Sequence, residues 1–184
     1  MNIYVMVDMQ NDFISGVFGT KEAQEILPKV INFVKNKKIF YTMDEHNTIV
    51  SEGIELQKFG KHCMEGTVGR LMPQELQVLL DEDYCYRKDT FMPYEQYDGK
   101  ELWDDILYEE DRNDCKFKNN NVYVFGLCTD ICVLNTALYL RNNLQYDNII
   151  ILKDLCAGTT PEKHEMALKV MESNLIEIKE SKEI

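Results

Sequence analysis

Short apolar runs alternating with helical patterns constrain the fold of this chain more than any other feature. Residues 3–7 are apolar on both faces of a strand, and residues 21–37 place apolar side chains three and four positions apart, as a helix does. Strands that are apolar on both faces and separated by helices are typical of parallel sheets covered on both sides. We therefore predict an α/β three-layer sandwich, with a mostly parallel central sheet and helices on both faces.

The same pattern continues to the end of the chain. Further strands are expected at residues 38–43, 84–87, 122–125, 148–152 and 175–178, the last at an edge of the sheet. Further helices are expected at residues 73–80, 100–108, 130–142 and 161–172, and residues 44–69 are expected to be largely irregular. No internal repeat or linker rich in Gly, Pro or Ser interrupts the sequence, so we expect a single domain over residues 1–184.

The charge balance narrows the classes of partner. The 184 residues include 20 basic and 32 acidic ones, which gives a formal net charge of −12 at pH 7. Such a chain repels nucleic-acid phosphates and anionic lipid. No apolar run approaches the roughly 18 residues of a membrane span, and no secretory signal pattern opens the sequence. We expect no nucleic-acid partner, no membrane partner and a cytoplasmic location.

The six cysteines, at positions 63, 85, 115, 128, 132 and 156, include no Cys-x-x-Cys pair. In a chain without a secretory signal, such cysteines are typical of free thiols in a reducing compartment. We expect neither a disulfide scaffold nor a four-cysteine zinc site.

Polar residues follow several of the predicted strands. Asp8 follows the first, Asp44 the second and Lys88 the third, and the fourth runs into a turn that contains Cys132. Ligands of parallel α/β sheets bind beyond the carboxyl ends of the strands, so these side chains are expected to converge in one crevice. A thiol at the start of a helix has a lowered pKa, and a carboxylate can exchange its proton. The group is consistent with a cysteine nucleophile, although each residue alone also fits a structural role.

The irregular stretch carries residues suited to a metal ion. Asp44, His46 and His62 offer oxygen and nitrogen ligands for Zn²⁺ or a similar divalent ion, and Glu55 could add a carboxylate. An Asp-x-His pattern also occurs often on solvated loops. The third histidine, His164, lies in the last predicted helix, and we interpret it as structural or solvated.

Several aromatic residues lie a few positions from a candidate site residue. Phe13, Phe59, Phe91 and Tyr94 have this placement and could line a flat aromatic pocket.

Four segments carry recognisable motifs. They are Asp8-Met-Gln-Asn-Asp12-Phe13, His62-Cys-Met-Glu-Gly-Thr-Val-Gly69, Lys88-Asp-Thr-Phe91 and Gly126-Leu-Cys-Thr-Asp-Ile-Cys132-Val. These segments resemble, in the same order, the motifs Asp-x-Gln-x-Asp-Phe, His-Cys-x-x-Gly-Thr-x-Gly, the lysine segment and Gly-x-x-Thr-Asp-x-Cys-Val of one family. That family is the nicotinamidase branch of the isochorismatase-like cysteine hydrolases, and the resemblance covers nearly the whole chain.

The resemblance implies a catalytic triad of Asp8, Lys88 and Cys132. It also implies an oxyanion hole formed by the backbone N–H groups of Cys128 and Cys132, and a non-proline cis peptide between Leu127 and Cys128.

The resemblance further implies one divalent metal ion bound by Asp44, His46 and His62. Some members add a glutamate seven residues before the last histidine, which here is Glu55. Zn²⁺ is the first expectation, and Fe²⁺ or Mn²⁺ also suit such ligands.

The metal loop departs from the family pattern at two places. Glu45 stands where the family usually has Trp, and Phe59-Gly60-Lys61-His62 replaces the usual Phe-Pro-Pro-His.

The expected function is hydrolysis of nicotinamide to nicotinate and ammonia through a cysteine thioester, with the aromatic ring among Phe13, Phe59 and Phe91. One alternative is another hydrolase of this superfamily, acting on a different small amide or ureide, or on isochorismate without metal. An alternative of another class is a non-catalytic metal-binding protein on this fold. Members often form dimers or larger assemblies, so a homo-oligomer is also expected.

Overall fold

The computed structural model describes residues 2–47, 54–92 and 120–184. Six parallel strands form one sheet in the order β3-β2-β1-β4-β5-β6. The strands are β1 (Asn2–Val7), β2 (Phe40–Asp44), β3 (Cys85–Lys88), β4 (Asn121–Leu127), β5 (Asn148–Ala157) and β6 (Glu177–Lys179). The predicted α/β sandwich is confirmed, and every described strand of its sheet is parallel.

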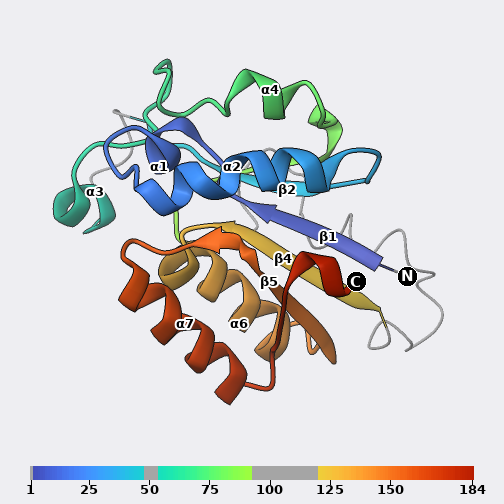
Figure 1. Ribbon diagram of the computed structural model, residues 1–184. Coiled ribbons are helices and arrows are strands. Elements are labelled where there is room, and N and C mark those ends of the chain that lie inside the picture. The colour runs from blue at the N-terminus through green and yellow to red at the C-terminus, as the bar shows by residue number, and fades with distance from the viewer. Residues whose placement is uncertain (1, 48–53, 93–119) are drawn as a thin grey trace.

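Helices cover both faces of this sheet. They are α1 (Asn11–Ile14), α2 (Lys21–Val34), α3 (Ile54–Phe59), α4 (Gln74–Gln77), α6 (Leu134–Asn142) and α7 (Pro161–Ser173). Helix α2 lies on one side of the sheet, whereas α6 and α7 lie together on the other (Figure 1). The chain moves outward from β1 to β3 and then outward from β4 to β6, so right-handed crossovers place the two sets of helices on opposite faces.

Local sequence signals account for the two long helices. Thr20 caps α2 by accepting a hydrogen bond from the N–H of Ala23, and Thr160 caps α7 in the same way. Helix α2 buries one face, and α7 begins with Pro161, which suits the first turn of a helix. In the described part of the chain, no helix is both long and apolar enough to cross a membrane.

The strand order reverses between β1 and β4, and Val7 at the end of β1 pairs with Gly126 of β4. Gly126 in β4 has a φ of +124°, and a Cβ atom there would lie 2.1 Å from the carbonyl oxygen of Val7. Only glycine fits such a position. The carboxyl ends of β1 and β4 therefore meet at the switch point of the sheet, where this class of fold binds its ligands.

The structure differs from the sequence-based expectation in several details. Strand β5 extends to Ala157, beyond the predicted residue 152, because it pairs with β4 again after an irregularity between Val124 and Gly126. The short helices α1 and α3 were not predicted, because four and six residues carry little periodicity. The helix expected at residues 100–108 lies outside the described residues.

Candidate active site and metal centre

Lys88, at the end of β3, connects the candidate residues at the carboxyl edge of the sheet. Its Nζ lies 2.7 Å from Oδ2 of Asp8, 3.2 Å from Oδ1 of Asp44 and 3.7 Å from Sγ of Cys132. The side chain is buried, which disfavours its charge, but the nearby anionic groups of Asp44 and Asp8 raise the pKa of Lys88 well above its ordinary value. One buried ammonium group therefore links the expected triad to the expected metal cluster.

Asp8 directly follows β1 and is fully buried. Its Oδ1 accepts a hydrogen bond of 2.6 Å from the hydroxyl of Thr42, and its Oδ2 faces Lys88. Burial raises the pKa of Asp8 above its ordinary value, and Lys88 only partly opposes this shift. A carboxyl group with a raised pKa is suited to accept and return a proton near neutral pH.

Cys132 lies on one turn of π-helix, Thr129–Val133, that leads into α6. The sequence suggested a lowered thiol pKa, since the residue is near the start of a helix. That expectation is wrong: burial raises the pKa of Cys132 well above its ordinary value, and Lys88 only partly opposes this shift. Cys128 takes the N-cap position of this turn, and its side chain makes no capping hydrogen bond.

The peptide bond between Leu127 and Cys128 is cis, as expected. The carbonyl oxygen of Cys128 accepts hydrogen bonds from the N–H groups of Ile131 (3.0 Å) and Val133 (3.2 Å). This turn brings Cys128 and Cys132 to the same pocket.

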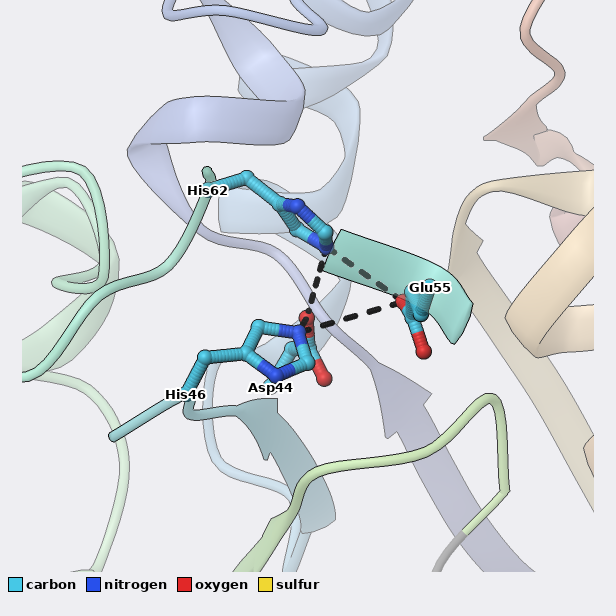
Figure 2. A group of neighbouring side chains, drawn as sticks. All are labelled: Asp44, His46, Glu55 and His62. Carbon is cyan, nitrogen blue, oxygen red and sulfur yellow. Dashed lines mark hydrogen bonds and ion pairs between the residues drawn. The ribbon is translucent and has the colours of Figure 1, made fainter. Parts of the chain in front are cut away.

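The four candidate metal ligands converge. One ligand atom each from Asp44, His46, Glu55 and His62 can be chosen so that all four lie within 4.8 Å of one another. Figure 2 shows the four side chains pointing toward a common centre, with Glu55 contributed by α3. Nε2 of His62 lies 3.3 Å from both Oδ2 of Asp44 and Oε1 of Glu55, and Nε2 of His46 lies 3.0 Å from Oδ2 of Asp44.

Two features of this cluster fit a divalent ion. Oδ2 of Asp44 and Nε2 of His46 are buried, yet neither makes a well-directed hydrogen bond to a described residue. Nδ1 of His62 lies 2.8 Å from the carbonyl oxygen of Gly60, a contact that leaves Nε2 facing the centre. The mixture of imidazole and carboxylate donors suits Zn²⁺, Fe²⁺ or Mn²⁺.

The candidate metal ligands shift one another's pKa values. Burial disfavours protonated His62, but the contacts of its ring with the carboxylates of Asp44 and Glu55 outweigh burial and raise the pKa of His62 to about 10. Burial also disfavours ionised Asp44, but Lys88 and the two histidines hold the pKa of Asp44 below its ordinary value. A divalent ion bound by these side chains would therefore compete with protons for the same ligand atoms.

Gln10 and Asp12 support this centre, although the sequence reading gave them no role. Nε2 of Gln10 donates a hydrogen bond to the carbonyl oxygen of Asp44 (2.7 Å), and Oε1 of Gln10 accepts one from the backbone N–H of Asp44 (2.7 Å). Oδ2 of Asp12 accepts a hydrogen bond of 2.8 Å from the N–H of Cys63, which follows His62. Their place in the first motif was the one signal that could have indicated these positions.

Glu45 lies between two candidate ligands but does not join the cluster. Its Oε2 forms ion pairs with Nη1 of Arg70 (2.5 Å) and Nε of Arg87 (3.1 Å). Successive side chains of an extended strand point to opposite faces, so Asp44 and His46 face the centre while Glu45 faces away. A cavity of about 510 Å³ adjoins both arginines, but it contains none of the candidate catalytic or metal-binding residues.

The three phenylalanines expected to bind substrate line one pocket. Phe13, Phe59 and Phe91 share it with a fourth, Phe18, that the sequence reading missed. The pocket also contains Glu55, His62, Cys128, Ile131, Cys132 and Thr159. The ring of Phe18 lies 4.9 Å from that of His62, centroid to centroid, and no sequence motif pointed to it. Tyr94, the other aromatic candidate, lies outside the described residues.

Comparisons with known proteins agree with this fold. The sequence matches the family model of the isochorismatase domain over residues 2–183. The crystal structure of a pyrazinamidase of Pyrococcus horikoshii in complex with zinc is 25% identical, with a TM-score of 0.71, and the match covers 97% of this chain and 98% of that one.

Two curated relatives extend over most of the chain. A nicotinamidase of Schizosaccharomyces pombe is 25% identical over 205 residues, which cover 95% of this chain and 90% of that protein. A protein of Arabidopsis thaliana named as a probable inactive nicotinamidase is 24% identical over 176 residues, covering 87% and 82%. An enzyme and a protein named as inactive are thus similar to this chain to nearly the same degree, and the chemistry has to be argued from the site.

Proposed function

Because the chain belongs to the isochorismatase family of hydrolases, we propose that it is a metal-dependent nicotinamidase, which hydrolyses nicotinamide to nicotinate and ammonia. The observation that carries this proposal is the position of Lys88. Its ammonium group contacts Asp8, Asp44 and Cys132, so a nucleophile, a proton acceptor and a metal ligand lie around one buried charge. A purely structural ion pair would need neither the thiol nor the adjacent aromatic pocket.

The first half of the reaction forms a thioester. Asp8 takes the proton of Cys132, and the thiolate attacks the carboxamide carbon. Lys88 holds both side chains and compensates their negative charge. The backbone N–H groups of Cys128 and Cys132 receive the negative charge that develops on the amide oxygen. When the C–N bond breaks, Asp8 returns its proton to the leaving nitrogen, and ammonia departs.

The second half of the reaction restores the enzyme. Asp8 takes a proton from water, the hydroxide oxygen attacks the thioester carbon, and the C–S bond breaks. The thiolate recovers a proton from Asp8, and the product leaves as the carboxylic acid, which releases its own proton to water to become the carboxylate. The raised pKa of Asp8 supports this double use, because a carboxyl group that titrates closer to neutral pH can exchange protons in both directions.

The pocket beside Cys132 supports a flat aromatic substrate. Phe13, Phe18, Phe59 and Phe91 supply apolar walls, and the candidate ligands Glu55 and His62 lie on the same pocket. A divalent ion held by Asp44, His46, Glu55 and His62 would offer a coordination position to a ring nitrogen. The family resemblance supports the same substrate orientation.

Ammonia release from nicotinamide tests the proposal. Purified protein is assayed as isolated, after chelation, and after addition of Zn²⁺, Mn²⁺ or Fe²⁺. We expect activity that chelation removes and metal restores. Benzamide serves as the matched control substrate, because it has the same carboxamide and ring size but no ring nitrogen. We expect its hydrolysis to be much slower.

Two other outcomes would contradict parts of the proposal. Equal rates on benzamide and nicotinamide would reject the role of the ring nitrogen. No ammonia release with metal bound would reject nicotinamide as the substrate, and a panel of small amides and ureides would then separate another hydrolase of this family from a non-catalytic metal-binding protein.

A further inference from the structure

The turn that carries Cys132 is held from outside by α7 and by the segment that joins β5 to α7. Thr129, the first residue of the turn, is fully buried, and its hydroxyl lies 2.8 Å from Nδ1 of His164 on α7. The two residues are 35 positions apart in sequence. The chemistry proposed above uses neither of them directly.

The next residue of the turn is held by the same segment. Oδ1 of Asp130 accepts a hydrogen bond of 2.7 Å from the N–H of Thr159, and Oδ2 accepts one of 2.6 Å from its hydroxyl. The backbone approaches so closely here that a Cβ atom on Gly158 would lie 2.8 Å from the backbone nitrogen of His164. Two consecutive residues of the turn are therefore held by Thr159, which precedes α7, and by His164, which lies on α7.

The hydrogen bonds to Thr129 and Asp130 hold the part of the site where the proposed chemistry is most sensitive to geometry. Thr129 lies directly after Cys128, so its position affects both the proposed oxyanion donor of Cys128 and the start of the turn that presents Cys132. A single turn of π-helix is an irregular structure, and such turns often occur at functional sites. A displacement of about 1 Å at a reacting group can reduce a rate by roughly 100-fold.

We propose that His164 is a positioning residue: through Thr129 it fixes the turn between Cys128 and Cys132, and so aligns the thiol with the proposed oxyanion hole. The proposal rests on the proposed function, and it assigns a role to the histidine that the sequence suggested was structural or solvated. The hydrogen bond to Thr129 excludes a merely solvated side chain.

The neutral imidazole is the form that fits this role. Burial lowers the pKa of His164, so near neutral pH the ring carries one N–H and one lone pair. Its tautomer decides whether Nδ1 accepts from the Thr129 hydroxyl or donates to it. Asparagine can place an amide donor or acceptor near the position of Nδ1, whereas phenylalanine keeps a ring without either.

Four variants and one control test the proposal: H164F, H164N, T129V, the double variant T129V/H164F, and T136V. Thr136 is the matched control, because it is equally buried and its hydroxyl makes no hydrogen bond to a described residue. Steady-state ammonia release gives kcat and KM for nicotinamide. The rate of Cys132 alkylation by iodoacetamide gives a substrate-independent measure, and circular dichroism shows whether each variant is folded.

For H164F and T129V we expect kcat to fall roughly 10- to 100-fold while KM stays within about threefold. The double variant should be no worse than the poorer single variant, since both break one interaction. H164N should recover most of the loss, and T136V should match the wild type. Alkylation of Cys132 should change by more than about threefold in H164F and T129V and return toward the wild-type rate in H164N.

Unchanged kcat in folded H164F, additive losses in the double variant, or failure of H164N to recover activity would overturn the proposal. If the wild type releases no ammonia from nicotinamide, the proposed function fails by itself. The alkylation rates then decide on the positioning role alone, and equal rates in wild type and H164F would reject it.

Discussion

Nζ of Lys88 lies 2.7 Å from Oδ2 of Asp8, although Lys88 ends β3, Asp8 follows β1, and β2 runs between these two strands. The pair therefore reaches across β2, where Thr42 donates a hydrogen bond to Asp8 and Asp44 accepts one from Lys88. Both side chains have an exposed fraction of 1% or less. An ion pair this deeply buried has lost its hydration, so each charged group depends on the opposite charge of its partner for stabilisation.

Replacing Lys88 by methionine should therefore reduce stability as well as activity. The change leaves Asp8 and Asp44 buried without their shared cation, which should lower the free energy of unfolding by about 3–5 kcal/mol. Urea unfolding of metal-free protein measures it. Lys153→Met is the control, because Lys153 forms a partly exposed ion pair of 3.7 Å with Glu180, for which we expect at most about 1 kcal/mol. Equal midpoints for wild type and Lys88→Met would contradict the buried pair.

Replacing Cys132 by alanine should abolish ammonia release and leave metal binding intact. The thiol is the proposed nucleophile, so we expect kcat to fall about 10⁴-fold or more, whereas metal content should not change. Elemental analysis and the ammonia assay give the two quantities. Cys85→Ala is the matched control, since Cys85 lies on β3 and lines the separate larger cavity. Wild-type turnover by Cys132→Ala would refute the thioester mechanism.

Much of this fold could be predicted because it is encoded in local patterns. The apolar residues of β1 and β4 are buried on both faces, and the two long helices carry their own caps. The extension of β5 to Ala157 could not be predicted, because Lys153 and Asp154 interrupt the apolar run, and pairing with β4 sustains the strand beyond them. Long-range pairing of this kind leaves no periodicity in the sequence.

In the candidate site too, some features follow from local sequence patterns and others depend on long-range packing. The convergence of Asp8, Asp44 and Lys88 could be predicted, because charged residues at strand ends are conspicuous and the parallel topology brings those ends together. Phe18 and the contact between Thr129 and His164 were missed, because they depend on how loops pack against one another. The lowered thiol pKa expected for Cys132 was wrong, because a helix position says nothing about burial.

Replacing the candidate metal ligands one at a time should distinguish them, by the loss of Zn²⁺ affinity, from adjacent residues that do not bind the metal. His62→Asn and Asp44→Asn should weaken Zn²⁺ binding by more than the roughly 10- to 100-fold that loss of an outer-shell partner costs. Competition with a zinc chelator of known affinity measures the change. Glu45→Gln is the control within the same strand end, because the Glu45 side chain pairs with Arg70 and Arg87. A larger effect in Glu45→Gln than in His62→Asn would contradict the assigned ligands.

Metal binding should also change the reactivity of Cys132. The thiol pKa is raised, first by burial and in part by the negative charges of Asp8 and Asp44. At pH values below that pKa, the thiolate fraction rises about tenfold per pH unit, and alkylation rises with it. A divalent ion compensates the charge of Asp44, which removes one cause of the raised pKa. At a fixed pH we therefore expect faster alkylation of Cys132 with metal and slower alkylation after chelation.

Iodoacetamide labelling between pH 6 and pH 10, followed by peptide mass spectrometry, measures this coupling at Cys132 separately from the other cysteines. The plot of Cys132 alkylation rate against pH should be shifted to lower pH in metal-loaded protein relative to chelated protein. Cys156, whose pKa is raised to about 12 mainly by burial, is the internal control, because none of the candidate metal ligands contributes to its shift. Coincident curves for Cys132, or an equal displacement at Cys156, would mean that the metal site and the nucleophile are not coupled through Asp44.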